Sequence, residues 1–312
     1  KTGVFDRLGI ALSGGKDSSL SLVVAWLYAR KRFRELSDPE RAKRIRDFIH
    51  CFSMPTRFNS DTTKQLSRKL ANELGVQFKE VAIGDAFDRE IEIASDMLEP
   101  GSELTPLARQ NIQARLRGMR MWNWANSARG MWIQTGNMSE KAVGYTTVGG
   151  DLMGAYSLIG NLPKTIVIRL LAYLHRTCEI ETLGELLATK ASAELSDDQE
   201  DERDLMPFPV LDACFALFAG ERLMPTELYQ ALRSRWSDEE LLALRSDYRH
   251  GMLKEWVKRF CRLFVGSIFK WVQSPQSVHL GTLDLDRERA LQLPVVQSTE
   301  WLDIDEIDSL PD

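Results

Sequence analysis

The stretch Leu8–Leu20, "LGIALSGGKDSSL", decides the fold class of this chain. Its first residues form an apolar run typical of a buried strand, and the residues after "SGG" have the apolar spacing of a helix. Gly14 and Gly15 let the backbone approach a ligand closely. Free N–H groups at the helix start, with the hydroxyls of Ser13 and Ser18, are suited to bind phosphate oxygens. The stretch therefore predicts a phosphate-binding turn, with a plain side-chain N-cap as the alternative.

Asp17 is the unusual member of this turn. A carboxylate beside bound phosphates is repulsive unless a cation lies between them, so Asp17 predicts a Mg²⁺ site. The common G-x-x-x-x-G-K-[ST] phosphate loop is absent, because Lys16 directly follows the glycine pair. We therefore expect a phosphate and magnesium site of a different kind.

Strand and helix patterns alternate along the first half of the chain. Apolar runs predict further strands in 47–54, 76–83 and 130–136, and helical periodicity is found in 61–74, 85–97 and 107–127. This alternation predicts a doubly wound parallel α/β sheet with helices on both faces and ligands at the carboxyl ends of its strands.

The second half of the chain follows a different pattern. A glycine-rich loop around 146–162 is expected to visit the site, and the chain beyond it is expected to be mainly helical to about residue 273. The acidic segment 189–207 has few apolar residues and should be mobile or exposed. The tail from residue 280 should be irregular.

The composition is that of an ordinary globular protein, with 44% of the 312 residues hydrophobic and 27% charged. A net charge of −5 argues against non-specific nucleic-acid binding, and no apolar run reaches the roughly twenty residues that span a bilayer. The four cysteines form no C-x-x-C pair, which fits a reducing cytoplasm. We expect a cytoplasmic protein without nucleic-acid or membrane partners. The basic stretch 30–46 is interpreted as a solvated helix and turn, with a nucleic-acid patch as the alternative.

Several other polar residues are placed where they can contribute to the site. Glu140 follows a predicted strand and is a candidate second ligand of Mg²⁺; complementing a helix dipole is its alternative role. Lys164 begins a predicted helix, where a cation is unfavourable, so a ligand phosphate is its expected partner. Asn111 and Arg115 are one turn apart and share a helix face, although a surface ion pair is an alternative for Arg115.

The turn "SGGKDS" resembles the SGGxDS loop of the N-type ATP pyrophosphatases. Further segments resemble, in order and spacing, the NAD synthetases, and in particular the synthetase half of the glutamine-dependent form. These segments are "CFSMP" at 51–55, "LTPLARQNIQARLRG" at 104–118, "IQTGNMSEKAVGYTTVGGDLMGAYSLIGNLPKT" at 133–165 and "KASAELSDDQEDE" at 190–202. The resemblance implies an adenine-nucleotide alpha hydrolase-like (Rossmann-like) sheet with a helical C-terminal part, a synthetase domain at 1–279 and a C-terminal tail at 280–312.

The resemblance also implies roles for single residues. It implies catalytic roles for Asp17, Asp151 and Lys164, and metal binding by Asp17 and Glu140. The implied ATP-binding residues are Ser13, Gly14, Gly15, Asp17, Ser18, Met54, Thr135, Lys164 and Ser192. The implied substrate-binding residues are Asn111, Arg115, Asp151 and Lys270. In this family the backbone at the position of Met54 reads the adenine edge, and the Asp matching Asp151 lies near the incoming ammonia. Trp271 departs from the pattern of ammonia-dependent members, where Arg is expected.

The implied reaction is the ATP-dependent amidation of deamido-NAD to NAD by a ligase. An adenylated intermediate forms with release of pyrophosphate, and ammonia then displaces AMP. The resemblance implies a homodimer or higher homo-oligomer that requires Mg²⁺. The N-terminal glutaminase domain of the glutamine-dependent form is not part of this chain, so ammonia is expected to be free or to come from such a domain or partner. Another N-type ATP pyrophosphatase, such as a GMP synthetase, and a noncatalytic nucleotide-binding module stay open as alternatives.

Overall fold

The computed structural model describes residues 4–189, 194–196, 201–286 and 291–312. At its centre lies a five-stranded sheet in the order β3–β2–β1–β4–β5, and all neighbouring strands are parallel. The strands are β1 (Arg7–Ala11), β2 (Ile49–Ser53), β3 (Gln77–Glu80), β4 (Gly130–Gln134) and β5 (Tyr156–Ser157). The direction of strand order reverses between β1 and β4, and such a switch point is where doubly wound sheets bind ligands. The predicted doubly wound parallel sheet is confirmed.

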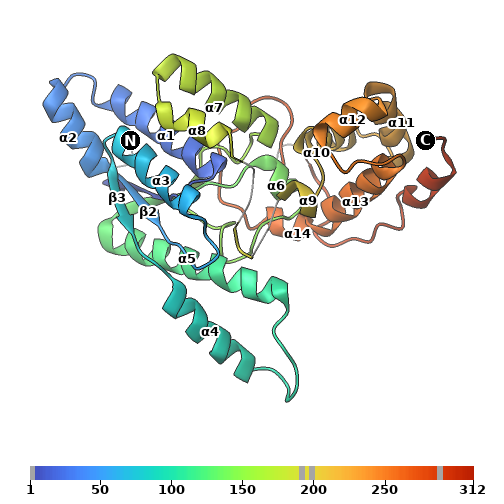
Figure 1. Ribbon diagram of the computed structural model, residues 1–312, viewed down its shortest axis with the longest axis horizontal. Coiled ribbons are helices and arrows are strands. Elements are labelled where there is room, and N and C mark those ends of the chain that lie inside the picture. Colours follow the sequence, from blue (N-terminus) through green and yellow to red (C-terminus); the bar gives the residue numbers. More distant parts are fainter. Residues whose placement is uncertain (1–3, 190–193, 197–200, 287–290) are drawn as a thin grey trace.

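Helices cover both faces of the sheet, as the sequence predicted (Figure 1). One face carries α1 (Lys16–Arg32), α2 (Asp38–Phe48), α3 (Asp61–Glu73), α7 (Lys164–Cys178) and α8 (Glu181–Leu187). The other face carries α4 (Gly84–Asp96) and α5 (Pro106–Ala128). The strand predicted at 47–54 begins at Ile49 instead, because α2 continues through Phe48. The basic stretch 30–46 is divided between the end of α1, the following turn and α2.

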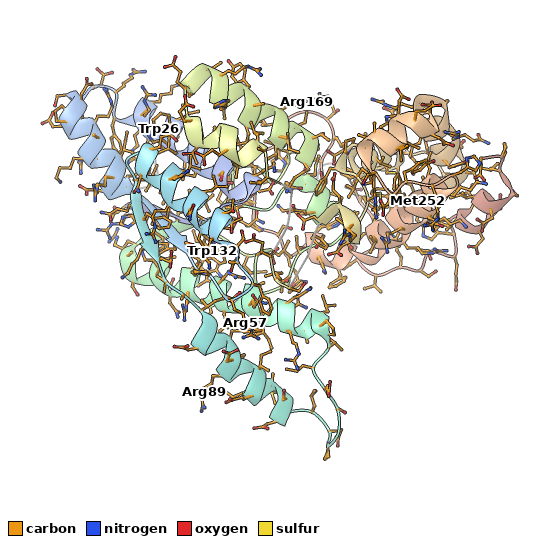
Figure 2. The ribbon with its side chains drawn as sticks, viewed as in Figure 1. Trp26, Arg57, Arg89, Trp132, Arg169 and Met252 are labelled. Carbon is orange, nitrogen blue, oxygen red and sulfur yellow. The ribbon has the colours of Figure 1, made fainter. Side chains whose placement is uncertain are left out.

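The tryptophans of α5 pack against the sheet. Trp124 lies flat on two strand glycines, since a Cβ added at Gly9 would come within 2.0 Å of its ring and one at Gly130 within 2.5 Å. Trp132 of β4 is buried between the sheet and α5, where its ring meets that of Trp122 edge-on (Figure 2). The aromatic-rich part of α5 is therefore structural, and it fixes the helix that carries Asn111.

Most of a helical unit stands to the right of the sheet in Figure 1, and its first helix lies between β4 and β5 in the chain. It contains α6 (Met138–Ala142), α9 (Asp201–Asp204), α10 (Phe208–Phe215), a π-helix (Ala216–Gly220), α11 (Pro225–Arg235), α12 (Asp238–Leu244), α13 (Met252–Gly266) and α14 (Ile268–Trp271). Their apolar side chains form one cluster, which includes Met252 (Figure 2). The tail is not irregular throughout, because the 3-10 helix Ile304–Ser309 buries Ile304 and Ile307 in the same cluster. Among the described residues, no helix is both long and apolar enough to cross a membrane.

Candidate functional site

A cavity of about 310 Å³ opens at the carboxyl ends of β1 and β4. It brings together most of the residues singled out from the sequence: Ser13, Gly14, Gly15, Asp17, Ser18, Asn111, Thr135, Glu140, Asp151, Lys164 and Lys270. These residues come from the sheet edge, from α5, from the glycine-rich loop and from the helical unit. The fold therefore assembles them from segments far apart in the sequence.

The turn after β1 is a backbone cradle that requires glycine. Gly14 has φ +85°, and a Cβ there would lie 2.1 Å from the carbonyl oxygen of Thr63. The turn is closed by the N–H of Gly15, which donates to Oγ of Ser13 at 3.1 Å. The N-cap of α1 is Gly15, with no side chain bonded to the helix start. The plain N-cap alternative is therefore wrong, and the first N–H groups of α1 face the cavity without a side-chain cap.

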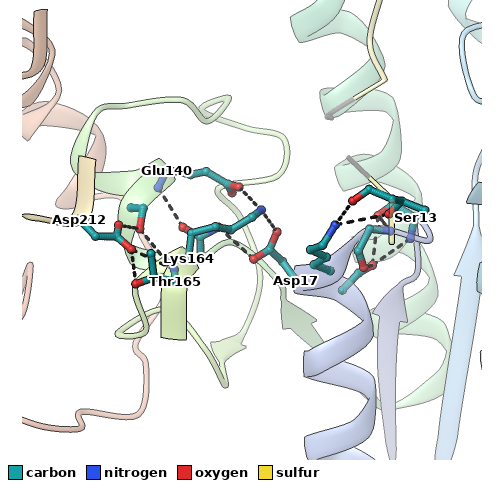
Figure 3. A network of polar contacts seen from close by, with 12 residues as sticks. Ser13, Asp17, Glu140, Lys164, Thr165 and Asp212 are labelled. Carbon is teal, nitrogen blue, oxygen red and sulfur yellow. Dashed lines mark hydrogen bonds and ion pairs between the residues drawn. The ribbon is translucent and has the colours of Figure 1, made fainter. Parts of the chain in front are cut away.

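Two carboxylates converge on one buried ammonium at the centre of the cavity (Figure 3). Nζ of Lys164 donates to Asp17 and, at 2.9 Å, to Oε1 of Glu140. Asn137 holds the arrangement, because its Nδ2 donates to Asp17 at 2.9 Å while its Oδ1 accepts from the N–H of Glu140 at 3.0 Å. The starts of α1, α6 and α7 therefore meet at a single cationic position.

The electrostatics of this cluster fit a divalent cation. Burial raises the pKa of Glu140 to about 8, with the charge of Asp17 adding to the rise and Lys164 opposing it. Burial lowers the pKa of Lys164, but Asp17 and Glu140 outweigh this and raise it, so Lys164 stays charged. Mg²⁺ is commonly held by one or two carboxylates together with substrate phosphates. Asp17 and Glu140 are therefore suited to hold Mg²⁺ beside the phosphate-binding turn.

Glu140 does lie in the first turn of α6, where its charge complements the helix dipole. Its carboxylate, however, reaches out of α6 to Lys164 at the start of α7. The two interpretations made from the sequence are therefore compatible.

Asp212 of α10 holds the two helix starts together, and it was missed by the sequence analysis. Its Oδ2 accepts from the N–H of Thr165 at 2.9 Å and from Oγ1 of Thr165 at 2.7 Å, and its Oδ1 accepts from the hydroxyl of Ser139. Oγ of Ser139 in turn accepts from the N–H of Lys164 at 2.8 Å. Asp212 thus fixes α7 against α6, and with them the positions of Lys164 and Glu140. No local pattern marks it, since its partners lie 47 and 73 residues away.

Lys16 is a second residue that the sequence analysis did not assign to the site. It is buried, lines the cavity and donates from Nζ to the carbonyl of Thr189, three residues before Ser192, which the resemblance assigns to ATP binding. Burial, followed by the charge of Lys164, lowers its pKa. Two lysines therefore flank the phosphate-binding turn.

A smaller cavity of about 210 Å³ adjoins the first and shares Ser13, Thr135 and Asp151 with it. Met54 lines this smaller cavity. The carbonyl of Met54 accepts from Nε of Arg117 at 3.0 Å, so an arginine not singled out from the sequence orients the backbone there. Burial lowers the pKa of Arg117 to about 10.

The glycine-rich loop brings polar groups to the other end of the main cavity. Oδ1 of Asp151 accepts from the N–H of Thr147 at 2.8 Å, and Oγ1 of Thr147 donates to Asn111 at 2.7 Å. Nζ of Lys270 donates to the carbonyls of Gly144 and Thr146, at the start of this loop, at 2.6 and 2.8 Å. Asp151 opens to the cavity, and the protein around it raises its pKa by desolvation.

Arg115 is placed differently from these residues. It is exposed and is not among the residues that line the two cavities. Its Nε donates to the carbonyl of Val148 at 3.2 Å, so it supports the outside of the glycine-rich loop. No ion pair of Arg115 is seen in the described part of the chain, and its role in substrate binding stays a prediction.

The acidic segment is only partly described, and Ser192 lies outside the described residues. Glu194 reaches across the cavity and accepts from Asn59, Ser60 and Thr63, at 3.1, 2.8 and 2.7 Å. Asp201 is 4% exposed and lines the cavity. The expectation of a mobile or exposed segment is therefore wrong at Asp201, because α9 folds back onto the site instead of extending into solvent.

The sequence profile of NAD synthase matches residues 2–250 of this chain. The chain belongs to the NAD synthase family. Curated relatives named glutamine-dependent NAD(+) synthetase include that of Thermotoga maritima, 31% identical over 72% of this chain and 36% of the relative, and that of Aquifex aeolicus, 32% identical over 72% and 36%. This NAD synthase-family chain therefore spans well under half the length of those relatives.

Solved structures agree with the fold of this family member. The chain superimposes on a glutamine-dependent NAD(+) synthetase from Cytophaga hutchinsonii with a TM-score of 0.82 and 22% identity, covering 97% of this chain and 52% of that one. An NMN synthetase from Francisella tularensis gives a TM-score of 0.56 and 20% identity, covering 83% and 87%. At such identities the likeness shows the shared adenine-nucleotide alpha hydrolase-like fold alone.

Proposed function

We propose that this NAD synthase-family chain is an AMP-forming ligase that amidates deamido-NAD to NAD with ammonia. The observation that carries the proposal is one cavity with two chemically different ends. One end holds the glycine turn with Asp17, Glu140 and Lys164, and the other holds Asn111 and Asp151. The first suits a triphosphate and its cation, and the second suits a neutral nucleophile and a polar substrate.

ATP would lie along the turn after β1. The N–H groups of α1 and the hydroxyls of Ser13 and Ser18 would bind the phosphates, with Lys164 and Lys16 supplying positive charge. The adjoining cavity at Met54 would receive the adenine. A glutamine-dependent NAD+ synthetase from Acinetobacter baumannii, whose fold is similar to that of this chain, was solved in complex with adenosine diphosphate. Thr135 lies where the two cavities meet, and Ser192 would approach from the second loop.

Asp17 and Glu140 would hold Mg²⁺, which supplies positive charge to the departing pyrophosphate when bound. Lys164 would supply further positive charge at the pyrophosphate, because it is buried and cationic between both carboxylates. Catalysis of adenylation would thus rest on positioning and on charge neutralisation.

Deamido-NAD would bind at the other end, with Asn111 and Lys270 beside it and Arg115 supporting the loop. Asp151 would hold ammonium and accept its proton, leaving ammonia to attack the adenylated carbonyl while AMP departs. This assignment is supported by the place of Asp151 at the cavity wall and by its raised pKa, which makes it a better proton acceptor.

The wider setting is also proposed. Residues 1–279 would form the synthetase domain and 280–312 its tail, and the protein would act in the cytoplasm as a homodimer or higher homo-oligomer. Ammonia would be free or would come from a glutaminase domain or partner, because the curated relatives are named for glutamine.

The test is an incubation with deamido-NAD, ATP, Mg²⁺ and ammonium, in which NAD and AMP are quantified together. We expect the two products in equal amounts, with no NAD when ammonium is omitted. Nicotinate mononucleotide and xanthosine monophosphate serve as competing substrates in parallel reactions. Faster turnover of either would replace deamido-NAD as the substrate, and absence of AMP formation with all three would favour a noncatalytic nucleotide-binding module.

A further inference from the structure

Besides the main cavity at the phosphate turn and its smaller neighbour at Met54, the structure has a cavity of about 650 Å³, called the second cavity below. It lies beside the main cavity, called the first, and is lined by residues of α6, by residues near β5 and by the segment 271–286. Two helices supply neighbouring residues to both cavities. From α6, Glu140 lines the first cavity and Lys141 the second; from α14, Lys270 lines the first and Trp271 the second. The proposed function makes no use of this second cavity.

Lys141 is a buried cation that faces the second cavity. Its residue is 4% exposed, and in the described part of the chain its ammonium has neither a hydrogen bond nor an ion pair. Trp271 fixes its backbone, because its Nε1 donates to the Lys141 carbonyl at 2.9 Å. Burying an ammonium without a partner is costly.

Two hydroxyls in this region are buried without partners in the described part of the chain: Oγ of Ser157 and Oγ of Ser274. A Cβ added at Gly160 would lie 2.5 Å from Nζ of Lys141 and 2.7 Å from Oγ of Ser157, so these two atoms lie within about 5 Å of each other. Ser274 lines the cavity itself. The groups that lack a partner are therefore an ammonium and hydroxyls, all of which can donate hydrogen bonds.

The acidic residues of the cavity already have partners. Nδ1 of His279 contacts Asp284, and its Nε2 lies 3.4 Å from Asp286. The negative charge of Asp284 also acts on Lys141. A negative field of this kind tolerates a ligand with one negative charge better than a ligand with two.

We propose that this second cavity is a binding site for a small organic monocarboxylate. Its carboxylate accepts hydrogen bonds from Lys141 and Ser274, and its organic part extends between Tyr156 and Trp271, which line the same cavity. Gly160 is required in this site, because any side chain there displaces the ammonium. The site is distinct from the proposed ATP and deamido-NAD site and does not depend on the proposed function.

The experiment is a calorimetric titration of the whole chain with acetate, butyrate and benzoate, repeated with saturating ATP and at constant ionic strength. We expect saturable binding that ATP does not displace, and weaker or no binding of methyl phosphate. Lys141→Met, which removes the charged group and keeps most of the length of the side chain, should weaken carboxylate binding at least tenfold. Lys79→Met removes the same charge from an exposed strand residue and should leave binding unchanged.

Gly160→Ala and Ser274→Ala keep the inference testable even where Lys141→Met fails to fold. Gly160→Ala should weaken binding by displacing Nζ, and Ser274→Ala should weaken it a few-fold. Circular dichroism verifies that each variant is folded. The proposal is overturned by absence of saturable binding, by displacement with ATP, by tighter binding of methyl phosphate, or by unchanged binding in the folded variants.

Discussion

Lys164 and Lys141 are both buried lysines, and α6 contributes to the surroundings of each, yet their partners differ completely. Lys164 lies between Asp17 and Glu140 at the start of α7. Lys141 has no such partner in the described residues and faces a cavity instead. The comparison teaches that burial alone does not define the role of a lysine. Lys164 completes a charge cluster within the protein, whereas the charge of Lys141 can pair with a ligand.

The largest effect is expected when Lys164 is removed. Lys164→Met leaves Asp17 and Glu140 facing each other without a cation, so we expect a loss of about 3–5 kcal/mol in unfolding free energy. Adenylation should fall to background because the phosphates lose their buried cation. Urea denaturation and pyrophosphate release measure the two effects. Stability equal to that of the wild type would contradict the structural role of the cluster.

The carboxylates are tested by Asp17→Asn and Glu140→Gln. Each change removes one charge at the proposed Mg²⁺ position, and we expect pyrophosphate release to fall by about 10²–10³-fold while the fold persists. Asp61→Asn changes an exposed aspartate at the start of α3 and serves as the control. Full activity in either site variant would exclude that residue as a ligand of the cation.

Asp151 lies at the other end of the cavity and differs from Asp17 and Glu140, because it has no ion pair among the described residues. In Asp151→Asn we expect NAD formation to fall by about 10²-fold, with pyrophosphate release less affected. Raising the pH should partly restore NAD formation, since more of the ammonium is then free ammonia. Equal loss of both products at every pH would assign Asp151 to substrate binding instead.

Asp212 acts on Lys164 through the helix starts and should have a smaller effect. Asp212→Asn places an amide against the donors of Ser139 and Thr165, and we expect a loss of about 1–3 kcal/mol in unfolding free energy. Turnover should fall with little change in the KM for ATP, since the phosphate turn is untouched. Asp212→Glu should restore part of the rate, and Asp305→Asn on the exposed 3-10 helix should change neither quantity. An unchanged rate in Asp212→Asn would show that Asp212 serves stability alone.

The smallest effect on stability is expected at Lys141. Lys141→Met removes a buried charge that has no protein partner, and it should stabilise the fold by ~1 kcal/mol, opposite in sign to Lys164→Met. Thermal unfolding in chloride buffer, without carboxylates, measures the difference. A loss as large as that of Lys164→Met would show that Lys141 is paired within the protein.

The sequence was most informative where the chemistry is local. The turn at Ser13–Ser18 is defined by a strand, two glycines and a helix start within a few residues, so its conformation could be predicted; its role as a phosphate site stays a prediction. The alternation that follows predicted the sheet, except β5, which is only two residues long. Periodicity cannot detect so short a strand.

Contacts between distant segments could not be predicted in this way. Asp212 bonds residues of α6 and α7 from α10, Lys16 reaches Thr189, and Arg117 holds the backbone of Met54. Each of these side chains has an ordinary local context in the sequence. The burial of Asp201 could not be predicted for the same reason, since a dense acidic run is usually solvated and only the packing of α9 buries this residue.

The position of Lys164 also has a consequence for the folding of the protein. Structural metal sites often couple folding to the supply of the ion, because their ligands repel one another until it arrives. Here Lys164 is the counter-ion and is part of the chain. The charges of Asp17 and Glu140 are neutralised as soon as α7 docks against α1 and α6. We therefore expect the protein to fold without nucleotide or magnesium, and a chelator to abolish the proposed adenylation without unfolding the protein.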